Sequence, residues 1–133
     1  MATSPLYIAS RRSPSVAVTT ANTNTDGTSG TRTTIVTGAT NGTLVESLQI
    51  KSIIAAAATV VADTVRIWKT TGATTFLVKE VSVPAGAGVI GTANQEFDGV
   101  VALNVALLSG ETLQGSCHVS TNGYHVTANC GDY

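Results

Sequence analysis

Short runs of alternating apolar and polar residues follow one another along most of this chain. The clearest covers residues 44–54, where Leu48 and Ile50 share one parity and polar residues occupy the other. A period of two is typical of a strand with one buried face. Two positions break the pattern, since Glu46 falls among the apolar residues and Val45 among the polar ones. The segment nevertheless predicts a half-buried strand.

A hairpin and two further strands are predicted in the middle of the chain. Residues 63–69 and 75–83 are rich in β-branched and aromatic side chains, and the turn sequence TTGAT lies between them. Pro84 ends the second strand because proline has no amide hydrogen to give to the ladder. Residues 89–92 and the more continuously apolar residues 100–108 predict two more strands.

The last predicted hairpin decides how the two cysteines are placed. Its strands span residues 112–120 and 124–130. Asn122-Gly123 is a strong hairpin signal because both residues accept positive φ. A two-residue loop there sets Cys117 and Cys130 diagonally across the strands, about 7 to 8 Å apart at Cα, which favours free thiols, as does synthesis in a reducing cytoplasm. A rival turn at Gly123-Tyr124 would place the cysteines directly opposite and make a disulfide geometrically feasible.

The beginning of the chain differs from the rest. Residues 19–34 are almost entirely Thr, Asn, Gly and Ser, so they have little to bury and should form a loop or an extended arm. Within the preceding residues, Val16 and Val18 predict one short strand. The length of the chain is typical of a single domain. We therefore expect an extended N-terminal arm, residues 1–31, and a β-sandwich domain, residues 32–133.

One alanine-rich segment does not fit the β pattern. Residues 53–62 (IIAAAATVVA) favour a helix by propensity, but ten residues without a clean cap make a marginal helix. We expect a short helix or a connecting turn there. The other segments amount to about seven to nine short strands at spacings of roughly ten residues, which is typical of sandwiches and barrels. The sequence therefore predicts an all-β fold, a single jelly-roll-like β-sandwich.

Charge is scarce in this chain. Only 11% of its 133 residues are charged and the formal net charge is -1, whereas twenty-two residues are threonine. This composition excludes a basic nucleic-acid-binding protein. The longest uncharged aliphatic stretch has ten residues, about half of what a membrane-spanning helix needs. The N-terminus lacks the pattern of a secretory signal, so we expect synthesis in the cytoplasm. A surface so poor in charge favours coverage by other copies or by a partner.

No group of residues predicts catalysis or cofactor binding. Gly86, Gly88 and Gly91 spell G-x-G-x-x-G, but a proline precedes them and no helical period follows, so we interpret them as an inter-strand loop. His118 and His125 would share a face of the last hairpin, yet two imidazoles without a third ligand make a poor zinc site. The eight carboxylates are spread singly. We therefore expect no catalytic residue, no cofactor and no metal.

Two parts of the sequence resemble small structural proteins of tailed bacteriophages. The similar stretches are VRIWKTTGATTFLVKEVSVPA, residues 65–85, and LLSGETLQGSCHVSTNGYHVTANCGDY, residues 107–133. The residues that carry the resemblance are Lys79, Glu80, Val81, Val83 and Ala85, then Gly131, Asp132 and Tyr133. The chain departs from the family pattern at Cys130, where Gly is usual. The resemblance implies a virion component, most plausibly a capsid decoration (cement) protein built as a β-sandwich and often trimeric, with no catalytic residue.

Composition and resemblance together predict a non-enzymatic structural protein of a phage virion, assembled in the host cytoplasm. Its expected partners are the major capsid protein or other virion proteins, and further copies of itself, with a trimer favoured. Nucleic acid and membranes are not expected partners. The residues expected to contact partners are Tyr7, Ile8, Arg11, Arg12 and Trp68. The alternative is a carbohydrate-binding or tail-fibre module that stacks sugars on Trp68 or uses the loop around Phe97.

Overall fold

All regular secondary structure in the described part of the chain is β. The computed structural model describes residues 8–53, 61–85, 98–119 and 123–133. Its strands are β1 (Ser10–Arg12), β2 (Ser15–Val18), β3 (Thr33–Thr37), β4 (Thr43–Ser52), β5 (Asp63–Thr71), β6 (Thr74–Val83), β7 (Asp98–Leu107), β8 (Thr112–Cys117) and β9 (Tyr124–Asp132). This confirms the all-β prediction.

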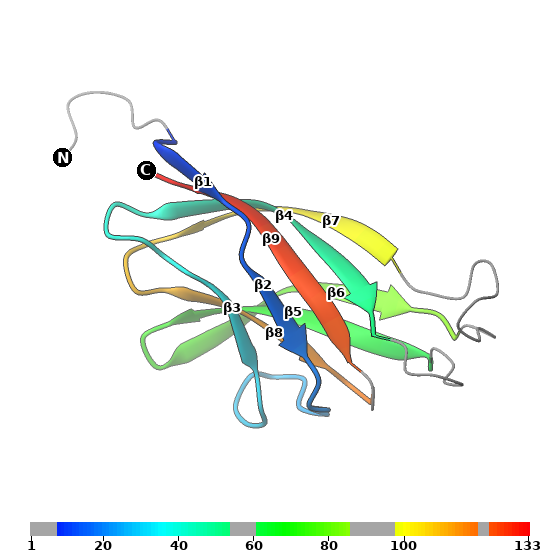
Figure 1. Cartoon of the computed structure of the whole chain (residues 1–133). Helices are drawn as coiled ribbons and strands as arrows, with labels where there is room; N and C mark the ends of the chain where they lie inside the picture. Colours follow the sequence, from blue (N-terminus) through cyan, green and yellow to red (C-terminus); the bar gives the residue numbers. More distant parts are fainter. Residues whose placement is uncertain (1–7, 54–60, 86–97, 120–122) are drawn as a thin grey trace.

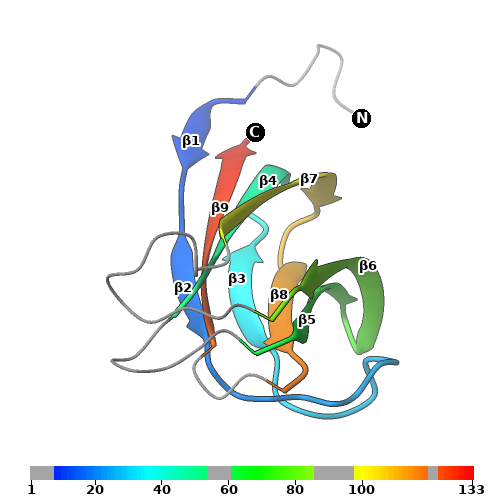
Figure 2. The ribbon, with the colours of Figure 1, turned by 90° about the vertical axis from the view of Figure 1, so that its right-hand side faces the viewer.

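The strands form two antiparallel sheets packed face to face, which confirms the predicted β-sandwich (Figure 1). One sheet has the order β1-β9-β4-β7, with β2 also paired to β9, and the other has the order β3-β8-β5-β6. The pairs β5/β6, β4/β7, β3/β8 and β2/β9 alternate between the sheets. The chain from β2 to β9 is therefore one antiparallel ribbon wound over both layers. In Figure 2, β6 and β7 lie together on one side, away from β1 and β2.

The interrupted alternation in β4 has a structural cause. The register of β4 with both neighbours shifts between Val45 and Ser47. Before the shift Val45 is buried, and after it Leu48 and Ile50 are buried. Because one irregular residue reverses which parity faces the core, Glu46 marks a β-bulge rather than an error in the pattern.

One of the two predicted hairpins is confirmed and the other is wrong. β5 and β6 pair along their length, with Gly72 in the turn at φ 58°. β8 and β9 instead lie in different sheets, where β8 pairs with β3 and β5, and β9 pairs with β1, β2 and β4. Gly123 does adopt a positive φ of 81°. A Cβ there would collide with the backbone carbonyl of Val18, so this glycine permits a close approach to β2 where the chain crosses between sheets.

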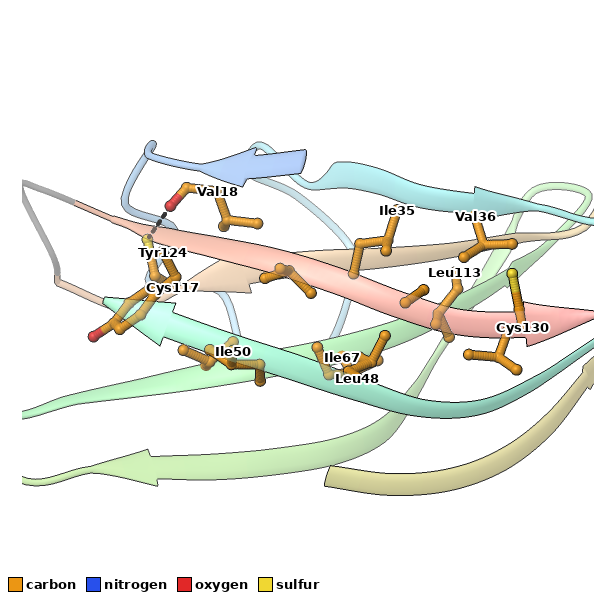
Figure 3. Close-up of a cluster of buried hydrophobic side chains, with 14 of the residues drawn as sticks. Val18, Ile35, Val36, Leu48, Ile50, Ile67, Leu113, Cys117, Tyr124 and Cys130 are labelled. Atoms are coloured by element: carbon orange, nitrogen blue, oxygen red, sulfur yellow. Dashed lines mark hydrogen bonds between the residues drawn. The ribbon is translucent and has the colours of Figure 1, made fainter. Parts of the chain in front are cut away.

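The described part of the predicted arm belongs to the sandwich. β1 and β2 both pair with β9, and the strand predicted at Val16 and Val18 is β2. Val18 is 1% exposed and lies among the core side chains (Figure 3). Apolar residues of β2 thus fill the core, and the division expected between residues 31 and 32 does not separate an arm from a domain in residues 8–31.

Both cysteines are free and buried in the core, which lies between the sheets. Cys117 ends β8 and Cys130 lies in β9, so neither of the two hairpin registers considered for them exists. The Sγ atom of Cys117 lies 3.9 Å from the carbonyl oxygen of Val18 (Figure 3). Burial raises the pKa of both thiols, which makes them poor nucleophiles.

Several predictions fall outside the described residues. They are the strand at 89–92, the glycines at 86, 88 and 91, the loop around Phe97, the contact residue Tyr7, and most of the helix or turn at 53–62. They stay predictions.

Candidate interaction surfaces

Trp68 lies in the interior and not on the surface. Its side chain is 1% exposed and its Nε1 donates a hydrogen bond of 2.9 Å to Ser116 Oγ. It projects from the four-stranded sheet on the face opposite to the core residues Val65 and Ile67 of the same strand. A Cβ added to Gly27 would lie 3.3 Å from the indole ring, so the β2–β3 loop covers it. The prediction of Trp68 as a contact residue, or as a sugar-stacking platform, therefore fails on burial.

The β2–β3 loop is held on the sheet by side-chain hydrogen bonds. Asn22 is 4% exposed and its Nδ2 donates to the carbonyl oxygen of Thr31 at 3.0 Å. Arg32 donates from Nη1 to the carbonyl oxygen of Gly27 and from Nε to Gln114 Oε1, both at 3.0 Å. The polar residues that predicted a loop thus bind one another and the outer face of the sheet. Composition indicated the loop but could not show which surface it covers.

Asp63 fixes the crossing from β8 to β9. Its Oδ1 accepts hydrogen bonds from the backbone N–H groups of Thr64 at 2.7 Å, and of His118 and Val119 at 2.9 Å each. Its Oδ2 accepts one of 3.0 Å from the hydroxyl of Tyr124. Asp63 is 8% exposed. One buried carboxylate therefore ties the end of β8 and the start of β9 to β5.

A polar cluster next to this crossing is also engaged in the fold. Arg66 donates from Nε to Glu80 Oε1 at 2.8 Å, and its Nη1 lies 2.9 Å from His118 Nδ1. Because guanidinium nitrogens only donate, His118 Nδ1 accepts. A pocket of about 470 Å³ lies beside it, lined by residues 62–64, 82–84, 118 and 119. Its two titratable lining residues, Asp63 and His118, already hold structural partners.

The predicted contact residues near the N-terminus differ in how far their side chains are engaged within the fold. Arg12 is 3.0 Å from Asp132 and donates to the carbonyl oxygen of Thr37 at 2.7 Å, so it holds β1 to the sandwich. Ile8 is half-buried and packs over Gly131. The side chain of Arg11 is 61% exposed and forms a 2.9 Å surface ion pair with Glu46. Exposed ion pairs of this kind add little to stability because solvent screens them, so Arg11 is able to exchange Glu46 for a partner.

The sandwich is open between β6 and β7. Phe76 pairs with Lys69, which pairs with the core residue Leu113, so all three lie on the core-facing side of their sheet. Phe76 is nevertheless 54% exposed. Leu107 at the end of β7 is buried, but three other residues of β7 that pack against the core are only partly buried, namely Val101, Leu103 and Val105. We call this apolar strip, formed by Phe76 and the three β7 residues, the open side. On the other side β2 and β3 approach each other.

The sequence pointed to the open side only indirectly. The nine residues from 100 to 108 are continuously apolar except for Asn104, and they predict a strand without showing where it lies in a sheet. The structure places that strand at a sheet edge, where Val101, Leu103 and Val105 are only partly buried. Phe76 is exposed as well, because no described strand covers β6 on this side.

Other chemistries find no support in the described residues. Within them no group of three or more His, Cys, Asp or Glu side chains could hold a metal ion. His118 follows β8 and His125 lies in β9, so the two imidazoles are not hairpin neighbours. The described ranges contain no helix able to span a membrane. No protein family, curated protein or solved structure matches the chain.

Proposed function

We propose that this protein is a non-enzymatic structural component of a phage virion, a capsid decoration protein that binds the outer shell and associates with further copies of itself. The observation that carries the proposal is the open side. An apolar strip left uncovered by the protein's own sheets favours burial against another protein. The low charge of the chain supports the same reading, since interface cores are depleted in charge.

The strand order supports a role in a shell. A ribbon of the pairs β5/β6, β4/β7, β3/β8 and β2/β9 wound over two sheets is the arrangement that we interpret as a jelly roll. Jelly rolls serve as viral capsid and lectin domains. Because one fold hosts many functions, this likeness adds weight only together with a site. The burial of Trp68 removes one of the two features on which a lectin function would depend, and the other, the loop around Phe97, lies outside the described residues.

The segment expected to reach the shell is shorter than the sequence indicated. Removing residues 1–31 would strip β1, β2 and the core residue Val18 from the sandwich, so loss of binding in that variant would report unfolding. Residues 1–9 precede β1, and Arg11 follows them with an exposed guanidinium. We assign shell contact to residues 1–9 together with Arg11, and self-association to the open side.

Co-sedimentation tests the proposal. The full chain is mixed with capsids assembled from the major capsid protein of the same genome, and we expect saturable pelleting with the capsids. Deletion of residues 1–7 keeps the packing of Ile8 on Gly131 and the hydrogen bond from the N–H of Ala9 to the carbonyl oxygen of Asp132. It should weaken binding at least ten-fold while the melting temperature stays close to that of the full chain. A matched control, Gln49→Ala, changes an exposed residue of β4 and should bind normally. A full chain that stays in the supernatant at every concentration would refute the function.

A further inference from the structure

The outer edge of β7 is an unpaired strand edge. β7 ends its sheet, and among the described residues only β4 pairs with it. The backbone N–H and C=O groups on its outer edge are therefore available to another strand. Such an edge is a template for pairing with another chain unless the protein blocks it.

The other sheet edges carry features that block pairing. The edge formed by β1 and β2 consists of two short strands separated by Pro14, and β3 lies against β2 of the other sheet. β6 carries Lys79 and Glu80, has a register shift, and is followed by Pro84. Short strands, bulges, charges and prolines are the means by which proteins protect edges. The only charged residue of β7 is Asp98, at its start.

A bulge limits which part of β7 can pair. Val105 lies opposite Val45, but Ala102 lies opposite Ser47, and Asn104 between them has a φ of 52°. The regular edge is therefore the five residues from Asp98 to Ala102. Its centre is Val100, which is 73% exposed, the largest fraction among the large apolar side chains of the described residues.

We propose that β7 pairs with β7 of a second copy, antiparallel, about a two-fold axis through Val100. In this register Val100 faces Val100, Gly99 faces Val101, and Asp98 faces Ala102. The two Asp98 carboxylates then lie at opposite ends of the paired segment, so no like charges stand opposite each other. The sheets of the two copies become continuous, and the contact is closed and isologous.

This inference specifies the self-association in the proposed function and rests on it. A second copy is the occupant because the segment from Asp98 to Ala102 contains no proline and no bulge, and its one charge, Asp98, lies away from the axis. Pairing also brings the half-buried Val101 of each copy beside the strand of the other copy. The resulting unit is a dimer rather than the trimer that the resemblance implies. Solution mass distinguishes the two.

Sedimentation velocity of the full chain without capsids tests the contact. We expect a concentration-dependent species of twice the 13.5 kDa chain mass. Val100→Lys should weaken it at least ten-fold, because two ammonium groups would meet at the axis. Val61→Lys is the matched control, since Val61 is 53% exposed and lies outside β7. A monomer at all concentrations, or a trimer, would overturn the proposal. Because no capsids are present, a failure to dimerise in this experiment can be distinguished from a failure to bind the shell.

Cysteine cross-linking tests the register. Val100→Cys should form an intermolecular disulfide on mild oxidation, since directly opposed residues lie within disulfide range. Ala102→Cys alone should not, whereas the double variant with Asp98→Cys and Ala102→Cys should. Both native thiols are buried, so the unmodified chain gives the background. Equal cross-linking through residues 100 and 102 as single variants would overturn the register.

Discussion

Asp63 offers the sharpest test of how the chain crosses between the two sheets. In Asp63→Ala, the N–H group of His118 keeps a second acceptor, the carbonyl oxygen of Thr64 at 3.1 Å. The N–H groups of Thr64 and Val119 and the hydroxyl of Tyr124 each lose the carboxylate as acceptor. A buried donor without a partner costs about 1–3 kcal/mol. Because Val119 is 43% exposed, its N–H group can regain water, and we expect the free energy of unfolding to fall by about 2–4 kcal/mol.

Urea unfolding followed by tryptophan fluorescence measures this loss, because Trp68 is the only tryptophan. Asp63→Asn keeps one acceptor oxygen and should lose only about 1–2 kcal/mol. Asp98→Ala is the control, since that exposed carboxylate has a single 3.5 Å contact with Gln49 and should change stability by less than about 0.5 kcal/mol. If Asp63→Ala were no less stable than Asp98→Ala, the crossing would not depend on this carboxylate.

Three further predictions concern the core residue Val18, the carboxylate of Asp132 and the two buried thiols. Val18→Ala should lower the free energy of unfolding by about 2 kcal/mol in thermal or urea unfolding; no loss would place β2 outside the core. The hydrogen bond from Thr43 lowers the pKa of the folded-state Asp132 carboxylate. The stability that this carboxylate contributes is therefore full above its unfolded-state pKa and is lost as pH falls through its folded-state pKa. In Asp132→Asn, the free energy of unfolding should depend less on pH between about pH 5 and 2. Cys117 and Cys130 should be unreactive toward a thiol reagent in native protein, and both should react in denaturant with or without reductant.

Local patterns were sufficient for the strands that alternate cleanly and for the β5/β6 hairpin. Their side chains and their turn lie within a few residues of one another, so the sequence contains the whole signal. The break in alternation at Glu46 and Val45 coincides with the bulge in β4. The sequence shows that the pattern breaks there, but it does not show that a bulge is the cause.

The partners of distant strands could not be predicted in this way. Asn122-Gly123 predicts a hairpin turn, whereas β8 pairs with β3 and β5 in one sheet and β9 pairs with β1, β2 and β4 in the other. Trp68 looked like an available aromatic because nothing local shows that the loop around Gly27 folds over it. Position in the sheet, which is a long-range property, decided which apolar residues became core and which became the open side.

Electron cryo-microscopy of purified virions tests the proposed function most directly. Maps of particles with and without this protein should differ by one sandwich-sized density at a fixed site on the outer capsid surface. The density should contact the shell near the start of β1. Identical maps, or density confined to the tail, would contradict the account.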